Sequence, residues 1–223
     1  MAPKPLITLF TLLLAAPCAL LSPLGCQGTY YKTMEMFGKE KRDLLVQRVK
    51  AARTDQEEAK EQFSDALERF SDLVNHDGGD LRKAYDKAKS EFEESEVRAE
   101  DVRDRIDDVE SVGKDLFSEW EKELKEYSSE QLRQNSRRQL RETRARYDEM
   151  LAAMKRAEAT MDPVLAAFRD QVLSLKHNLN AQAVAALRGS VTEVEAEIAE
   201  LILEMEASIR EADRFLKDMG SAA

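Results

Sequence analysis

Residues that could bind a metal ion gather in one glycine-rich stretch, Asn75-His76-Asp77-Gly78-Gly79-Asp80. Imidazole and carboxylate groups are common metal ligands, so His76, Asp77 and Asp80 define a candidate metal site. Their spacing lacks the alternating ligands and the terminal glutamate of a calcium loop. The same residues suit a helix–helix turn, in which the glycines adopt positive φ and Asp80 caps the next helix. We therefore expect a solvated turn here, with the metal site as the alternative.

Catalytic motifs are incomplete along the chain. Gly113-Lys114 is the closest approach to a nucleotide-binding loop, but Asp115 stands where that loop needs serine or threonine, and the earlier glycine is missing. No serine elbow, zinc-binding pair or cysteine nucleophile with a partner base can be assembled. The formal net charge of -10 argues against a dedicated nucleic-acid binder. We therefore expect a protein that is not an enzyme, uses no cofactor or metal and binds no nucleic acid.

An export signal is predicted at the N-terminus. Lys4 precedes an apolar run from Leu6 to Leu21, which is short for a bilayer span and is broken by Pro17. Turn-forming residues follow the run. This pattern predicts a cleaved signal peptide of the lipoprotein type over residues 1–25, not a permanent transmembrane helix.

Cys26 is the predicted attachment point of a lipid. Leu24-Gly25-Cys26 looks like the end of a bacterial lipobox, although Pro23 and Leu24 depart from that motif; Cys18 fits less well because a proline directly precedes it. Lipidation would make Cys26 the first residue of the mature chain and hold that chain on a membrane through several acyl chains. The alternative is a soluble secreted protein with a free Cys26 thiol.

Two long helices are predicted by apolar residues spaced alternately four and three apart. They run from Tyr30 to about Val74 and from Asp80 to about Tyr127. Both patterns fit coiled-coil seams, and the short loop between them forces an antiparallel hairpin. The second seam comprises Leu81, Tyr85, Ala88, Phe92, Ala99, Val102, Ile106, Val109, Leu116, Trp120 and Tyr127, and the polar or glycine interruptions of the two seams are Gln56, Ser95, Gly113 and Glu123.

A third helix is predicted from about Ser129 to Thr160, and its polar face is strongly basic. The plain interpretation is ion pairing with acidic residues of the second helix. The alternative is a face that contacts phosphate, lipid headgroups or an acidic polymer. The basic residues are Arg133, Arg137, Arg138, Arg141, Arg144 and Arg146, and the acidic residues are Glu93, Glu94, Glu96, Glu100, Asp101, Asp104, Asp107 and Asp108.

A break is predicted at Met161-Asp162-Pro163, where the aspartate can cap a fourth helix and the proline can begin it. The apolar phase of that helix slips between Leu179 and Val184, and a capping box starts at Ser190. The chain can fold back near Gly189 or continue as one rod. We favour the rod, because a turn this tight offers few loop residues.

These elements predict an all-α fold: an elongated antiparallel coiled-coil bundle of three to five long helices in a single domain, residues 26–223. A content of 35% charged and only 6% aromatic residues favours long solvated helices over a mixed fold. The seams do not distinguish a bundle within one chain from a homo-oligomer, so self-association stays open.

Several long stretches carry a family resemblance: YYKTMEMFGKEKRDLLVQRV, ARTDQEEAKEQFSDALERF, NHDGGDL, AEDVRDRIDDVE and MDPVLAAFRDQVLSLKHNLNAQAVAAL. They cover nearly all of the mature chain and resemble an uncharacterised family of predicted lipoproteins of Gram-negative bacteria, domain of unknown function 2959. The resemblance implies a lipid-anchored, coiled-coil protein of the cell envelope with no established activity. By analogy with lipoprotein sorting, Gln27 after the cysteine implies the periplasmic side of the outer membrane.

Two functional hypotheses follow. The first is a structural or interaction protein without catalytic activity, which is tethered through Cys26 and presents charged helix faces to envelope proteins. The second is a membrane-surface module, in which the arginine-rich face of the third helix binds anionic lipid.

Overall fold

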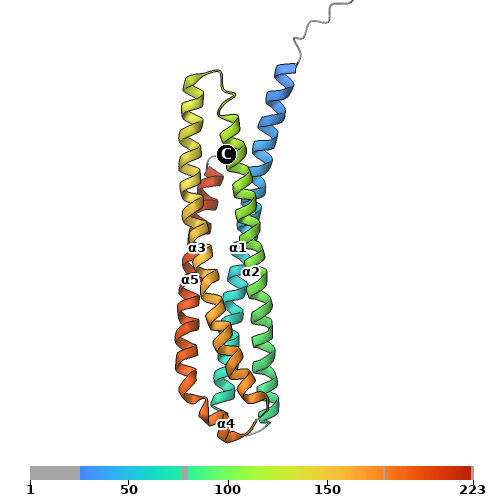
Figure 1. Cartoon of the computed structure of the whole chain (residues 1–223), viewed down its shortest axis with the longest axis vertical. Helices are drawn as coiled ribbons and strands as arrows, with labels where there is room; N and C mark the ends of the chain where they lie inside the picture. The colour runs from blue at the N-terminus through green and yellow to red at the C-terminus, as the bar shows by residue number, and fades with distance from the viewer. Residues whose placement is uncertain (1–25, 77–79, 178, 222–223) are drawn as a thin grey trace, which may run out of the picture. The chain divides into compact units, whose positions relative to one another are not determined.

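The computed structural model of the chain describes residues 26–76, 80–177 and 179–221, which form five helices and no strand (Figure 1). The helices are α1 (Cys26–Val74), α2 (Leu81–Glu123), α3 (Glu130–Lys176), α4 (Ala181–Ala186) and α5 (Arg188–Ser221). The prediction of an all-α bundle is confirmed. Met1–Glu35 and Met36–Ala223 are separate compact units, and the packing that follows is that of Met36–Ala223. The predicted signal peptide, residues 1–25, lies outside the described residues.

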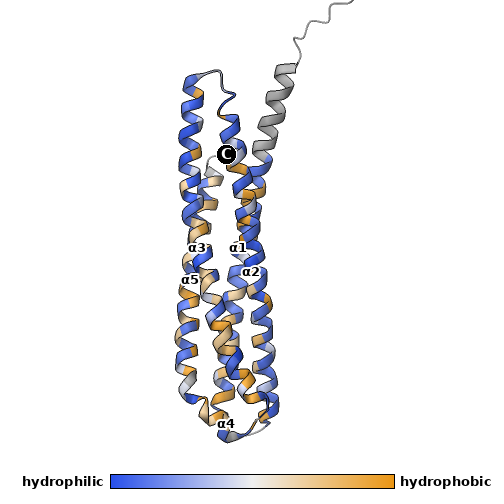
Figure 2. Cartoon of the chain, in the orientation of Figure 1, coloured by the Kyte–Doolittle hydropathy of each residue, from blue (hydrophilic) through white to orange (hydrophobic). Residues whose placement is uncertain are grey.

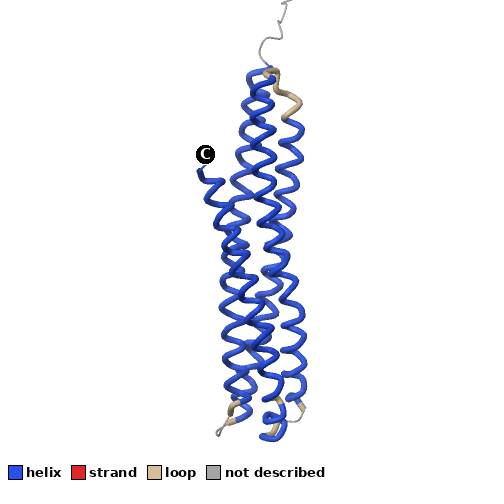
Figure 3. Tube along the Cα trace, turned by 90° about the vertical axis from the view of Figure 1, so that its left-hand side faces the viewer, coloured by secondary structure: helices blue, strands red, loops and turns tan. Residues whose placement is uncertain are grey.

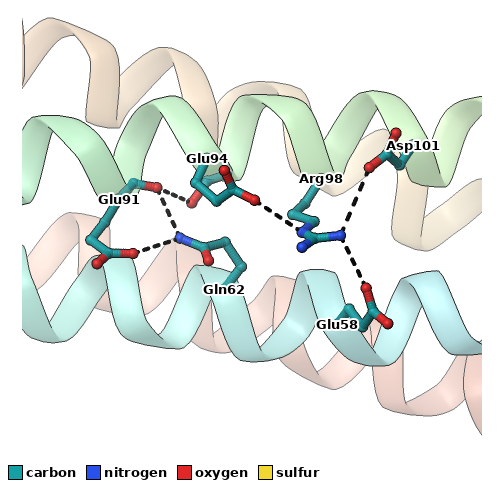
Figure 4. A network of polar contacts seen from close by, with 7 residues as sticks. Glu58, Gln62, Glu91, Glu94, Arg98 and Asp101 are labelled. Carbon is teal, nitrogen blue, oxygen red and sulfur yellow. Dashed lines mark hydrogen bonds and ion pairs between the residues drawn. The ribbon is translucent and has the colours of Figure 1, made fainter.

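Helices α1 and α2 lie side by side and run in opposite directions. Polar contacts join them along their length, and residue numbers rise along one helix as they fall along the other. Figure 4 shows the middle of this contact, where Arg98 and Glu91 of α2 reach across to α1. The nitrogen–oxygen pairs are Lys41–Glu119 (2.6 Å), Arg105–Asp55 (2.8 Å), Arg98–Glu58 (3.0 Å) and Gln62–Glu91 (2.9 Å).

Ion pairs also show which of the other long helices are neighbours and in which direction each runs. Each pairs with its neighbour in the opposite direction, so that α1, α2, α3 and α5 form a closed ring of antiparallel neighbours (Figures 1 and 3). The pairs are Arg144–Glu121 (2.6 Å) and Lys155–Asp107 (3.1 Å) for α3 and α2, Arg146–Asp218 (3.0 Å) and Arg156–Glu204 (3.6 Å) for α3 and α5, and Arg53–Asp213 (3.1 Å) for α1 and α5.

A continuous apolar core runs between these helices. Apolar positions recur along each helix (Figure 2), and the predicted seam residues Phe92 and Ile106 are buried. Phe168 of α3 contacts Phe70 of α1 with ring centroids 5.0 Å apart and Phe92 of α2 with centroids 5.5 Å apart. Three helices therefore meet at one aromatic contact, as burial of amphipathic stripes requires.

The predicted break at Met161-Asp162-Pro163 is wrong, because α3 continues through all three residues to Lys176. Pro163 removes one backbone hydrogen bond, but the proline and Ala159 are both exposed, so water can satisfy the carbonyl group that loses its partner. Met161 and Phe168 are buried on either side of the proline. Their packing outweighs the local cost of the proline. Asp162 forms an ion pair with Arg103 of α2 and does not cap a helix.

The preference for one continuous rod near Gly189 is also wrong. The chain turns back earlier, between Lys176 and Ala181, and α5 then runs antiparallel to α3. Asn180 makes this tight turn possible: its side-chain Oδ1 accepts hydrogen bonds from the backbone N–H groups of Gln182 (3.0 Å) and Ala183 (2.9 Å), so α4 begins at once. The apolar phase slip between Leu179 and Val184 marks this turn.

Two apolar residues near the turn between α2 and α3 are exposed, including Tyr127, which was assigned to a seam. Helix α2 ends at Glu123, four residues before Tyr127, so Tyr127 lies beyond the core and is 38% exposed. Leu132, in the first turn of α3, is 56% exposed. Leu124, directly after α2, is buried instead. The apolar spacing therefore overestimates the core at this end of the bundle.

Gly113 interrupts the seam of α2 because a large side chain packs on it. A Cβ atom at Gly113 would clash with the ring and hydroxyl group of Tyr147 from α3. Tyr147 is buried, and its hydroxyl donates to the Val109 carbonyl oxygen at 3.2 Å. Its ring centroid lies 5.1 Å from that of Phe117. Tyr147 is therefore held from several sides and has little room to move.

We predict that Gly113→Ala destabilises the protein. The expected loss is about 1–2 kcal/mol in the free energy of unfolding, because overpacking a filled core costs more than the roughly 1 kcal/mol that alanine gains over glycine within a helix. Urea denaturation followed by circular dichroism measures it. Gly189→Ala is the control, since nothing lies within 4 Å of its added Cβ. Equal stability of the two variants would contradict the packing account.

Gln56 of α1 forms a buried polar contact with α5. Ser208 Oγ donates to Gln56 Oε1 at 2.8 Å, and both side chains are fully buried. Gln56 Nε2 is also buried and has no hydrogen-bond partner among the described residues. The pair therefore favours one register of α1 against α5, although the buried Gln56 Nε2 donor stays unsatisfied.

A double-mutant cycle tests this pair. Ser208→Ala alone should lower the free energy of unfolding by about 1–3 kcal/mol, because it leaves buried polar atoms of Gln56 without a partner. Gln56→Leu combined with Ser208→Ala should restore stability to wild type or above, because it also removes the unsatisfied donor. Additive losses, measured by the same urea titration, would rule out a paired contact.

Candidate interaction surfaces

The six arginines predicted to form one basic face all lie in the first half of α3. The structure does not leave them as one free strip. Arg133 pairs with Glu130, Arg144 with Glu121 of α2, and Arg146 with Asp218 of α5. Arg144 also lies over the ring of Phe117, with 4.9 Å from Cζ to the ring centroid. Three of the six arginines are therefore used within the fold.

Of the other three arginines, Arg138 and Arg141 are exposed and Arg137 is half-buried. Arg138 hydrogen-bonds only to the neutral Asn135, and no carboxylate among the described residues pairs with Arg137, Arg138 or Arg141. Two exposed lysines also form no ion pair among the described residues: Lys122 in the last turn of α2 and Lys125 in the turn that follows. We call these five residues the basic tip: Lys122, Lys125, Arg137, Arg138 and Arg141.

The basic tip belongs to a locally cationic segment of an acidic protein. Residues 122–146 contain eight lysines and arginines and four glutamates, a formal net charge of +4, whereas the whole chain carries -10. Helix α5 ends alongside Arg146, so it has ended before the tip is reached. Burial, followed by the neighbouring charges of Glu119 and Glu126, raises the pKa of Glu123 in this segment.

The acidic residues of α2 are mostly paired, but not with the six arginines. Ion pairs do link α2 and α3, but each of them involves at least one residue that the predicted pairing did not include. Asp104 forms no ion pair among the described residues. The observed pairs are Glu93–Lys89, Glu94–Arg98, Glu96–Arg169, Glu100–Arg103, Asp101–Arg98, Asp107–Lys155 and Asp108–Arg48.

Lys155 and Tyr147 have strongly shifted pKa values for structural reasons. Burial alone would lower the pKa of Lys155, but the hydrogen bond to Asp107 and the charge of Glu158 raise it to about 12. Burial, and then the charges of Glu110 and Asp148, raise the pKa of Tyr147 to about 12. Both groups therefore stay protonated at neutral pH, one as a charged link between helices and the other as a hydrogen-bond donor.

A groove of about 340 Å³ lies between α1 and α5 and was not predicted. Ile202 supplies an apolar surface in it, and Leu203 beside it is 64% exposed. Glu61 and Asp65 line the groove without ion pairs among the described residues. A sequence signal exists, since residues 189–209 contain six glutamates and no lysine or arginine. The lining residues are Lys60, Glu61, Ser64, Asp65, Ile202 and Glu206.

The turn between α1 and α2 is capped as predicted. Asp80 accepts a hydrogen bond from the Lys83 backbone N–H at 3.1 Å, which begins α2. His76 and Asp80 line a pocket of about 300 Å³ with Arg69, which pairs with Asp72. Asp77 of the candidate metal site lies outside the described residues. Within the rest of the described chain, no group of three or more His, Cys, Asp or Glu residues is arranged to hold a metal ion.

Cys26, the predicted lipidation site, is the first residue of α1, and its side chain falls outside what the structure describes. Among residues 26–76, 80–177 and 179–221, no helix has both the length and the apolar character needed to cross a membrane.

Comparison with known proteins places the chain in a family. No curated protein matches it. A family model described as "Protein of unknown function (DUF2959)" matches residues 30–219, which include nearly all of the helical bundle. The chain therefore belongs to this family of proteins of unknown function.

Proposed function

We propose that the protein is a lipid-anchored structural or interaction protein of the bacterial cell envelope, without catalytic activity. One observation carries this proposal: ion pairs join the neighbouring helices, and the charged residues that form no ion pair among the described residues include two clusters, the basic tip and Glu61 with Asp65 of the α1–α5 groove. Unpaired charge beside exposed apolar surface is what a charged partner can recognise. The groove, with its carboxylates and the apolar side chain of Ile202, suits a cationic partner protein.

The tether would act at a defined end of the bundle. Lys41 pairs with Glu119 at 2.6 Å, so the early part of α1 lies beside the end of α2 that carries the basic tip. Cys26 precedes Lys41 by only 15 residues in the chain. We propose that the protein lies on the periplasmic side of the outer membrane; the predicted export signal, Cys26 and the residue Gln27 after it support this location.

Metabolic labelling with a radioactive fatty acid tests the tether. Wild-type protein should carry the label, and Cys26→Ser should lose it, because the serine offers no thiol for acylation. Cys18→Ser is the matched control and should keep the label. An unlabelled wild type, or a Cys26→Ser variant labelled as strongly as wild type, would contradict the proposed anchor.

A second candidate function is contact with an anionic membrane surface. It is favoured by Arg137, Arg138 and Arg141, for which the described residues provide no carboxylate partner, and it no longer requires the whole six-residue face. Each basic residue near an anionic surface contributes about 1 kcal/mol to binding, and salt screens that contribution.

Charge reversal tests the second candidate. In the full chain with Cys26→Ser, replacing Arg137, Arg138 and Arg141 by glutamate should abolish the excess binding to anionic over zwitterionic vesicles at low salt, as measured by co-sedimentation. Reversal of Lys83, Lys87 and Lys176, at the other end of the bundle, gives the same net charge and should leave that excess largely intact. An equal loss in both variants would mean that only net charge matters.

A further inference from the structure

We propose that the basic tip docks end-on onto an anionic phospholipid surface, beside the point where α1 enters the bundle. This inference deepens the second candidate function and rests on it. It differs from a helix face lying along a membrane, because it adds Lys122 of α2 and Lys125 of the following turn to the arginines of α3. The chemistry recognised is the phosphate group of a negatively charged lipid headgroup, which arginine binds through paired hydrogen bonds and lysine as a point charge.

The first argument is the distribution of charge along the bundle. The segment 122–146 carries +4, so the remaining residues carry -14. An anionic surface attracts the cationic segment and repels the acidic remainder of the chain, and both effects orient the molecule as it approaches the surface. The acidic stretch 189–209 lies in the part of α5 that begins at the far end of the bundle. A bundle lying along its α1–α5 side would bring Glu61, Asp65 and Glu206 toward the surface.

The second argument is the identity of the unpaired cations. Along the side where α2 meets α3, the basic residues Arg103, Lys155 and Arg169 are held by carboxylates of the neighbouring helix. Binding lipid there would break existing ion pairs. At the tip, Arg137 and Arg141 have no such pair to break, so their interaction with phosphate is not offset by a lost contact.

The third argument is geometric. The basic tip is built from the last residues of α2, the following turn and the first three turns of α3, within about 20 Å of the end of the hairpin at 1.5 Å per helical residue. Lys41 of α1 pairs with Glu119 at this same end. A tether on the preceding residues would therefore hold the tip at high local concentration near the headgroups, where weak contacts become populated.

The chain contains its own reporter for this contact. Trp120 is the single tryptophan and lies three residues before the end of α2. Its Nε1 donates to Ser136 Oγ of α3 at 2.9 Å, so the indole is fixed at the hairpin end that carries the tip. A quencher attached to lipid headgroups acts over a short range and therefore reports whether this end reaches the surface.

The experiment uses the full chain reconstituted on vesicles that contain a headgroup-labelled quencher lipid. One set is phosphatidylcholine alone, and the other also contains phosphatidylglycerol. At about 0.1 M salt, where the Debye length is about 10 Å, we expect stronger quenching of Trp120 with phosphatidylglycerol. At about 1 M salt, where the Debye length is about 3 Å, the difference should disappear.

Matched variants assign the effect to the tip. Arg137→Gln, Arg138→Gln and Arg141→Gln together should weaken the tip–surface association roughly 100-fold and bring quenching to the phosphatidylcholine level. Lys83→Gln, Lys87→Gln and Lys176→Gln remove the same charge at the far end and should keep the full signal. Circular dichroism of both variants confirms that they are folded.

Two outcomes would overturn the proposal. Equal quenching on both vesicle types shows that the tip does not contact anionic lipid, whatever holds the chain on the vesicle. A Trp120 signal that follows protein density and ignores lipid composition would instead assign the tip to the acidic surface of a second copy. Vesicle flotation of the same samples reports the tether separately: attachment to phosphatidylcholine without any lipid-dependent quenching refutes the tip and leaves the anchor standing.

Discussion

Burial of four apolar stripes in one shared core is the constraint on which the structure depends. Long helices are marginally stable alone, and the only cysteines lie at positions 18 and 26, so no disulfide can fasten the bundle. Contacts such as that of Phe168 with Phe70 and Phe92 must therefore supply most of the stability. Exposed ion pairs contribute about 0–1 kcal/mol each. They indicate which helices are neighbours more than they hold those helices together.

The residues that interrupt the apolar repeat fix these seams in a single register. A seam of alternating spacings can slide by one repeat and still meet apolar residues. The Tyr147 ring packs directly on Gly113, Ser208 donates a hydrogen bond to Gln56, and Trp120 donates one to Ser136. Each contact is lost if the helices shift. The interruptions of the apolar pattern are therefore the positions that choose one arrangement among several of similar hydrophobic burial.

Much of this fold could be predicted from spacing, because the apolar repeat of each helix survives in the structure. The break predicted at Pro163 was wrong because packing outweighs the local effect of the proline. The better signal was the helical spacing of apolar residues, which continues on both sides of the proline at Met154, Ala157, Met161, Leu165 and Phe168. The turn after Lys176 could not be fixed from sequence, since a capping asparagine replaces a visible loop.

The candidate site was only half predictable for a different reason. The sequence identified six arginines, but whether each is available to a partner depends on which carboxylates the helix register places beside it. Glu121 and Asp218 form ion pairs with two of the six. Lys122 and Lys125 were missed because they lie outside the third helix, in the end of α2 and the following turn, and join the tip only through the folding of the chain. The last residues of α5 lie near Arg146, so α5 does not pack against the α2–α3 end of the bundle. The backbone hydrogen bonds of that end should therefore open at a lower free energy than those in the middle of the bundle. Charged groups on such a compliant end can shift to fit a surface while the core stays closed.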